Sequence, residues 1–342
     1  MATAESQLPD LSRFLCDGFQ MPENQRQYFT DGMLHWKYFE RRGPWDGARS
    51  FIIHANGQIS AHIGVTTTEF VSPGDPALAV TAVHPVDWLS NQQGGMLGAM
   101  LMLQAFGRGT VQYSLGSTEI GQKVLIGAGF KAVCTVPVFH RVLRPASFPA
   151  WRLIHGRHHI PKQAALLAID LSRSVFRPRT DRDFKLEPVH EFTDEVSDLF
   201  RQSRQHFVCT SRTLELLNYF LRAPGGRVSG WLCRAEKRLV GFALTSMGER
   251  DGIRVGKIVD CFLAETEGNV WRSAVQALAS MLGGAGCDVV QTMASAPWFQ
   301  QALAASGFFP RGRGTFFLRD LGNAVPLTQP FHLTLLDGDQ AF

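Results

Sequence analysis

The sequence lacks a long hydrophobic run. None of its apolar stretches approaches the ~20 residues that a membrane-spanning helix requires, although 45% of its 342 residues are hydrophobic. The first residues include Glu5 and Asp10 and contain no apolar segment of the kind found in a secretory signal. We therefore expect a cytoplasmic protein with no membrane span and with enough apolar residues to fill the cores of two domains.

Paired cysteines and clustered metal ligands are also missing. The six cysteines are widely separated and form no C-x-x-C pair, so neither a zinc site nor a dithiol redox centre is predicted. His155, His158 and His159 lie among arginines with no acidic residue or cysteine beside them, and such cationic surroundings disfavour a bound dication. We expect no metal.

The sequence has no large excess of either charge. Its net charge of +4 falls short of the concentrated basic face that a nucleic-acid-binding protein presents. A group of basic residues lies between positions 146 and 188, and we interpret this segment as a helical connector. We expect no nucleic-acid partner.

A polar, glycine-rich loop joins a predicted strand to a predicted helix near residue 95. The strand runs from about Leu78 to Ser90 and is expected to bend at Pro85, and the helix runs from about Met96 to Phe106. The N–H groups at such a junction, and the positive end of the helix dipole, suit a phosphate group. The loop has neither a P-loop ending nor G-x-G-x-x-G spacing. A phosphorylated cofactor is predicted, bound through a different signature.

The segment from Gln93 to Gly98 resembles the Q/R-x-x-G-x-G/A loop with which GNAT acetyltransferases hold the pyrophosphate of acetyl-CoA. Met96 stands where that family usually has its central glycine, and a side chain there would crowd the approach of phosphate to the backbone. The resemblance implies acetyl-CoA or another acyl-CoA as co-substrate. It places the cofactor on Trp88, Leu89, Ser90, Gln93, Gly94, Gly95, Met96, Leu97, Gly98 and Ala99.

Two similar halves are indicated by an internal repeat at a spacing of 178 residues. Five residues of the first half recur in the second: Ser117, Gln122, Leu125, Gly129 and Phe130 as Ser295, Gln300, Leu303, Gly307 and Phe308. The order of predicted elements recurs too, with Asp260 in the place of Asp87. We predict an α/β (α+β) protein of two tandem GNAT-like units, each a twisted, mainly antiparallel mixed sheet flanked by helices.

The predicted units span residues 1–145 and 189–342, on either side of the connector at 146–188. In the second unit Glu265 and Glu267 replace the glycine-rich loop, and their carboxylates would repel a pyrophosphate. The acyl-CoA is therefore expected in the first unit only. The whole arrangement resembles bacterial tandem-GNAT proteins.

Acyl transfer to an amine requires that the amine lose a proton and that the departing thiolate be stabilised. The resemblance makes Asp87 and Glu119 candidates for the base or for a water relay. The acid stays open, since Leu125 stands where many GNATs have a tyrosine: Ser117, Tyr113 or a water would have to serve, or the thiolate leaves unassisted. A structural reading stays open for each carboxylate. Glu119 falls in the first turn of a helix that Ser117 would cap, and Asp87 could fix the neighbouring loop, as its recurrence at Asp260 suggests.

The predicted function is acyl transfer from acyl-CoA, most simply acetyl-CoA, to an amine of a small-molecule or sugar acceptor. The first unit would bind the donor and the second would help to form the acceptor cleft. Two alternatives stay open: a non-catalytic CoA-binding or scaffold module, and an O-acyltransferase. Aminoacyl transfer from tRNA is disfavoured by the modest charge. The acceptor, the acyl-chain length and the oligomeric state do not follow from the sequence.

Overall fold

The computed structural model describes residues 1–43, 47–73, 75–91, 95–107, 109–144, 184–203, 207–338 and 340. Gln93 and Gly94 of the glycine-rich loop lie outside the described residues, as does most of the predicted connector. The helix expected within that connector lies on these undescribed residues, and at its described end the chain forms a strand, β6 (Phe184–Val189). Its charged residues alternate with more buried ones, which is the period of a strand on the edge of a sheet.

The chain begins with helices that pack against the first strands. These are η1 (Glu5–Gln7), α1 (Leu8–Gly18), η2 (Glu23–Phe29) and α2 (Asp31–Tyr38). Helix α1 buries Leu8, Leu11 and Leu15 on one face, as expected of an amphipathic helix. Helix α2 begins where Thr30 accepts a hydrogen bond through its side chain from the backbone N–H of Met33. Both helices share a hydrophobic cluster with residues of the first strands, among them Ile52, Ile59 and Val86. This packing holds α2 against those strands.

The remaining elements follow the order that the repeat predicts. The first half contains β1 (Ser50–Ala55), β2 (Gln58–Ser72), β3 (Asp75–Ser90), α3 (Gly95–Phe106), β4 (Val111–Leu115), α4 (Glu119–Gly127) and β5 (Lys131–Val142). After β6, the second contains α7 (Asp194–Gln202), β7 (Cys209–Thr210), α8 (Leu214–Leu221), β8 (Val228–Ala235), β9 (Arg238–Arg250), β10 (Ile253–Leu263), α9 (Gly268–Gly284), β11 (Val289–Met293), α10 (Pro297–Ala305), β12 (Phe309–Asp320) and η4 (Leu335–Gly338). None of the helices in the described part of the chain is both long and apolar enough to cross a bilayer.

The repeated residues make the same local contacts in both halves. The side-chain amide of Gln122 donates to the carbonyl of Ser117 at 3.0 Å, and the equivalent amide of Gln300 donates to Ser295 at 2.9 Å. Gly129 ends α4 with a φ of 88°, and its counterpart after α10 has a φ of 80°. The repeat therefore encodes a strand–turn–helix unit that is built twice.

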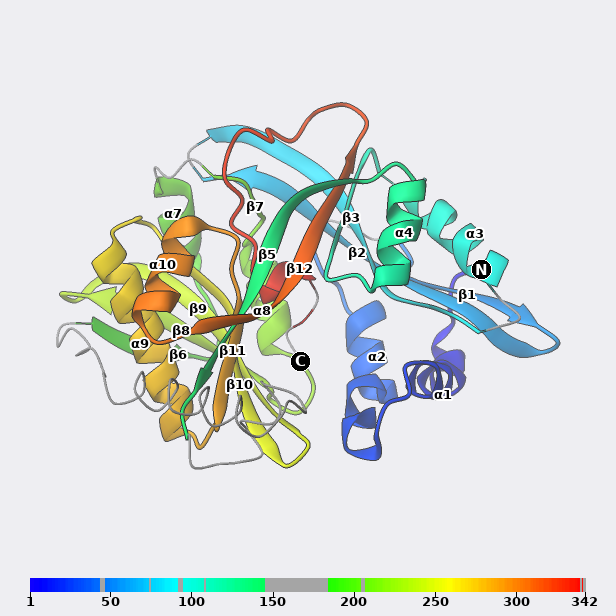
Figure 1. The fold of residues 1–342 in the computed structure, drawn as a ribbon, viewed down its shortest axis with the longest axis horizontal. Coiled ribbons are helices and arrows are strands. Elements are labelled where there is room, and N and C mark those ends of the chain that lie inside the picture. The colour runs from blue at the N-terminus through cyan, green and yellow to red at the C-terminus, as the bar shows by residue number, and fades with distance from the viewer. Residues whose placement is uncertain are drawn as a thin grey trace, which may run out of the picture.

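The two halves share one continuous sheet. Among the described residues it has 12 strands, in the order β1-β2-β3-β4-β12-β5-β11-β10-β9-β8-β6, with β7 paired to β2. The pairs β3–β4 and β10–β11 are parallel, and the other pairs are antiparallel. The last strand of each half lies in the other half's sheet, since β12 separates β4 from β5 and β5 pairs with β11. Figure 1 shows β5 and β12 side by side, with α3 and α4 on one side of them and α9 and α10 on the other.

Strand β3 is bulged, but not at Pro85, where the sequence predicted a bend. Pro85 pairs in register with Val65. The irregularity follows at Asp87 and Trp88, two residues that oppose the single residue Ile63 of β2, and Asp87 has a φ of 46°. The extra residue, rather than the proline ring, redirects the strand. Strand β10 has a register shift at the corresponding place, just before Asp260.

Candidate functional site

A cleft of about 300 Å³ opens between the diverging ends of β3 and β4. The two strands pair only at Ala82–Val111 and Val83–Gln112, and beyond that point no other described strand pairs with the β4 side of β3. Backbone groups left without a strand partner can receive an extended ligand in the manner of an added strand. The cleft is lined by residues from both strands, α3, α4 and the chain end, among them Asp87, Trp88, Met102, Ser114, Gly116, Ser117, Leu125 and Gln340.

Helix α3 meets β3 at its first turns, where the cofactor loop was predicted. The indole N–H of Trp88 donates to the carbonyl of Gly98 at 2.9 Å. A Cβ on Gly98 would lie 2.9 Å from Ser90 Oγ, so glycine is required for this close packing. Met96 is 81% exposed at the start of α3, with Leu97 and Ala99 beside it half-buried. The crowding of a phosphate by Met96 stays a prediction, because the preceding Gln93 and Gly94 lie outside the described residues.

The start of α4 forms another wall of the cleft. Thr118, and not Ser117 as predicted, caps this helix, because its Oγ1 accepts from the N–H of Gly121 at 3.2 Å. The hydroxyl of Ser117 instead bonds that of Ser114 at 2.6 Å, inside the cleft. Glu119 is exposed in the first turn and is not among the described residues that line the cleft. Its position is that of a carboxylate stabilised by the helix dipole.

Asp87 lies at the bulge and is held from three directions. Its carboxylate accepts a hydrogen bond from Tyr38 Oη at 2.5 Å and forms an ion pair with Lys37 Nζ at 2.6 Å. Its backbone carbonyl lies 2.9 Å from Nδ1 of His62. Burial lowers the pKa of His62 to about 4, so the ring is neutral and its proton is on Nδ1, facing that carbonyl. Nothing in the sequence pattern predicted that these three residues contact Asp87.

A larger cavity of about 720 Å³ lies on the other side of Asp87. Both halves contribute to it: η2, α2 and β5 from the first, and β9, β10 and β11 from the second. Lys257 of β10 lies in its wall and donates to the carbonyl of Gln340 at 3.0 Å, while Gln340 lines the smaller cleft. Burial, with the nearby charge of Arg250, lowers the pKa of Lys257 to about 8. The two spaces therefore adjoin at Asp87 and again at Gln340.

The equivalent place in the second half is filled by the chain itself. The backbone N–H of Ser295, the counterpart of Ser117, donates to Leu333 at 3.1 Å, and Nε2 of His332 lies 3.0 Å from the carbonyl of Cys261. Asp260, the counterpart of Asp87, is fully buried and bonded to Arg212.

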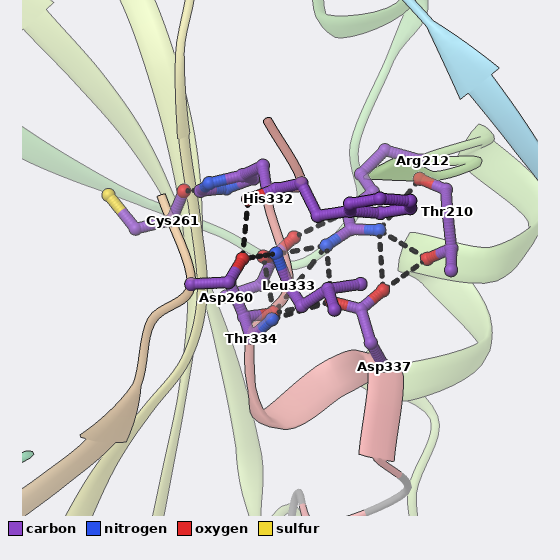
Figure 2. Close-up of polar contacts among 10 residues, drawn as sticks. Thr210, Arg212, Asp260, Cys261, His332, Leu333, Thr334 and Asp337 are labelled. Atoms are coloured by element: carbon purple, nitrogen blue, oxygen red, sulfur yellow. Dashed lines mark hydrogen bonds and ion pairs between the residues drawn. The ribbon is translucent and has the colours of Figure 1, made fainter. Parts of the chain in front are cut away.

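Figure 2 shows how this C-terminal segment is held against the second half. Arg212 lies between the carboxylates of Asp260 and Asp337, and Thr334 Oγ1 donates to Asp260 at 2.9 Å. The open cleft of the first half thus has a packed polar network as its counterpart. Glu265, which the sequence suggested would repel a pyrophosphate here, is a half-buried residue paired with Arg238 at 2.7 Å.

The described residues contain no group of three or more histidine, cysteine, aspartate or glutamate side chains placed to hold a metal ion. All six cysteines are free, and five of them are buried. Burial raises the pKa of the Cys209 and Cys233 thiols to about 12, so neither is a thiolate at neutral pH. The polar side chains among the described residues that line the two cavities carry carboxylate, hydroxyl, amide, imidazole, indole, ammonium and guanidinium groups.

No family model matches this sequence, and no curated protein matches it. Solved structures do match. A GCN5-related N-acetyltransferase of Anabaena variabilis shares 12% identity at a TM-score of 0.57, over 94% of this chain and 72% of that one. N-myristoyltransferase of Saccharomyces cerevisiae, with bound myristoyl-CoA and inhibitors, shares 12% identity at a TM-score of 0.63, over 94% and 79%.

A third structure, a GCN5-related N-acetyltransferase of Kribbella flavida, shares 12% identity at a TM-score of 0.52, over 93% of this chain and 70% of that one. At these identities the likeness concerns the fold. The strand order, the two parallel pairs with a bulge in each half, and these matches agree with one another. The predicted resemblance is confirmed at that level: this chain has the fold of the GNAT acyltransferases, built twice in tandem.

Proposed function

We propose that this protein is an acyl-CoA-dependent N-acyltransferase. The donor occupies the cleft between β3 and β4, and the acceptor amine enters from the 720 Å³ cavity. The observation that carries the proposal is the position of Asp87, which borders both spaces at the bulge of β3. Two substrates bound on either side of this residue would meet at one point, which is what a direct transfer requires.

The donor would bind as an extended chain along β3. The backbone of Trp88 and Leu89 offers hydrogen bonds to the pantetheine arm, in the way that an edge strand accepts a peptide. The pyrophosphate would lie at the loop from Gln93 to Ala99, where the first N–H groups of α3 and its dipole favour an anion. Yeast N-myristoyltransferase, whose structure contains myristoyl-CoA, supports a thioester of CoA as the donor class.

Transfer forms a C–N bond at the thioester carbonyl and breaks the C–S bond. Asp87 accepts hydrogen bonds from the attacking amine and holds it in place. This carboxylate already holds the ion pair with Lys37 and the hydrogen bond from Tyr38, so the amine's proton passes to water beside it. Ser117, which shares a hydrogen bond with Ser114 inside the cleft, donates to the leaving thiolate. Glu119 has no part in this scheme.

The test is calorimetric binding of acetyl-CoA and myristoyl-CoA to the wild type, Ser117→Phe and Ser117→Ala. Phenylalanine should fill the 300 Å³ cleft and weaken binding by about tenfold or more, since it places a ring where the pantetheine would lie. Alanine removes only a hydroxyl and should bind within about threefold of the wild type. Equal affinity in all three proteins would remove the donor from this cleft.

Turnover is then followed as release of the CoA thiol in the presence of amines. An enzyme should release thiol only when an acceptor is added, and Ser117→Ala should slow that release. The non-catalytic alternative has one observation in its favour, because the buried Leu125 stands in the cleft where a tyrosine acid was sought. Tight donor binding without thiol release across a broad panel of amines would support that alternative.

A further inference from the structure

The larger cavity carries more positive than negative charge. Among the described residues that line it, the cations are Lys37, Arg227, Arg250 and Lys257, and the acids are Asp87 and Glu249. Asp87 is already paired with Lys37 at 2.6 Å. Glu249 and Arg250 are exposed residues near the end of β9. The charge that faces the interior of the cavity is therefore positive.

Arg227 is a half-buried residue that lines this cavity, and its neighbours hold its guanidinium in place. Its guanidinium lies 5.3 Å from the centre of the Tyr28 ring, and its Nη2 donates to Oε1 of Gln27 at 3.1 Å. Both contacts come from η2, so the N-terminal segment holds the arginine in place. Its Nη1 is buried and has no hydrogen-bond partner within the described part of the chain. A buried donor of this kind is costly unless a ligand satisfies it.

We infer that the acceptor is an anionic amine, with a carboxylate or phosphate group bound by Arg227 at the end remote from its reacting nitrogen. This inference rests on the proposed function for the reacting end alone. The fork of a guanidinium matches a carboxylate or phosphate with two parallel hydrogen bonds. A cavity of 720 Å³ has room for a molecule with two separated polar ends, which a simple alkylamine would not fill. Polyamines would meet unfavourable charge there.

The first experiment needs no catalysis. Succinate, which has neither amine nor phosphate, and inorganic phosphate are titrated separately into the wild type, Arg227→Met and Arg250→Gln. Arg227→Met should weaken binding of the favoured anion by about tenfold or more, because it removes a charged donor whose Nη1 has no partner among the described residues. Arg250→Gln, at an exposed site in the same wall, should change it by less than about threefold. The probe that binds more tightly, and whose binding Arg227→Met weakens, shows whether the anionic group of the acceptor is a carboxylate or a phosphate.

The second experiment compares matched acceptors in the thiol-release assay. An amino acid is paired with its carboxamide, and phosphoethanolamine with ethanolamine. The anionic member should react faster, and Arg227→Met should abolish that preference mainly through KM. Arg227→Lys should restore part of it, which separates a lost charge from a lost fold.

Two results would overturn the inference while leaving acyl transfer intact. One is equal use of neutral and anionic amines by the wild type. The other is anion binding that Arg227→Met does not weaken although the variant melts within a few degrees of the wild type. Failure to bind any acyl-CoA would instead refute the proposed function, and the succinate and phosphate titrations would still report on Arg227.

Discussion

Replacing Arg212 tests whether the second half depends on its buried polar network. Arg212 donates to Asp260 at 3.0 and 3.2 Å and to Asp337 at 2.9 and 3.0 Å, and none of the three side chains is exposed (Figure 2). Burial alone would lower the pKa of Arg212, but the two carboxylates outweigh it and raise that pKa well above its usual value. Burial would raise the pKa of Asp337, but the charge and hydrogen bonds of Arg212 outweigh burial, so that pKa is lowered.

Arg212→Met leaves two carboxylates buried without a counter-charge. Breaking a buried pair in this way costs about 3 to 5 kcal/mol of unfolding free energy, and the volume of methionine limits any added cavity cost. The matched control is Arg238→Met. Arg238 pairs with Glu265 at a similar distance, 2.7 Å, but their side chains are 69% and 39% exposed, so its loss should cost less than about 1 kcal/mol.

Urea unfolding at several pH values measures both variants. A carboxylate with a lowered native pKa stabilises the fold above its unfolded pKa, and that contribution is lost as the pH falls through the native value. Asp337 gives the wild type this term, and Arg212→Met lacks it. The two proteins should therefore differ most near pH 7, and the difference should shrink as the pH falls below about 4 toward the lowered pKa of Asp337. Two results would refute the reasoning. One is a loss of unfolding free energy in Arg212→Met as small as that in Arg238→Met, and the other is a difference between Arg212→Met and the wild type that does not change with pH.

Two further predictions concern buried bases. Burial lowers the pKa of His62 to about 4, so as the pH falls the unfolded chain takes up this proton before the folded protein does. The unfolding free energy of the wild type should therefore fall by up to about 3 kcal/mol between pH 6.5 and 4. His62→Gln should flatten this pH dependence in acid unfolding. Lys257 has a pKa lowered to about 8, so the wild type should gain stability between pH 8 and about 10.5, where only the unfolded chain keeps the proton. Lys257→Met should remove that gain and should be more stable than the wild type by about 1 to 3 kcal/mol at pH 7 in urea titrations. If the variant were less stable than the wild type both at pH 7 and at about pH 10.5, the lowered pKa of Lys257 would be contradicted.

Local patterns predicted the elements that local physics controls. An Asn-Gly pair between two strand-like segments favours a tight hairpin turn, and Asn56 and Gly57, with φ values of 53° and 76°, form that turn between β1 and β2. The helix after the glycine-rich loop begins within a residue of its predicted start. The repeated Gly129 sits in a helix-ending conformation that glycine adopts without strain. Each of these depends on residues close together in the chain.

The exchange of strands depends on distant pairing and left no such pattern. Strand β12 pairs with β4, and Phe316 lies opposite Leu115, although about 200 residues separate them. The contacts of Asp87 also join distant parts of the chain, because its partner Tyr38 is 49 residues away. Helix α2 brings it there through packing that periodicity does not specify. The role of Asp87 stays a prediction, and the sequence pattern did not indicate the contacts with Tyr38, Lys37 and His62.

The difference between the two halves explains why a single donor cleft is expected from a duplicated fold. Both halves have a bulged strand, an aspartate at the bulge and a serine on the neighbouring strand's end. In the second half, the carbonyl of Leu333 accepts from the N–H of Ser295, and the N–H of Leu333 donates to Ser295 Oγ. Arg212 forms an ion pair with Asp260. A segment of the same chain thus satisfies, in one half, the polar groups that the other half presents to its cleft. Under the proposed function, the half that bonds its own chain would contribute a wall of the acceptor cavity, and the open half would bind the donor.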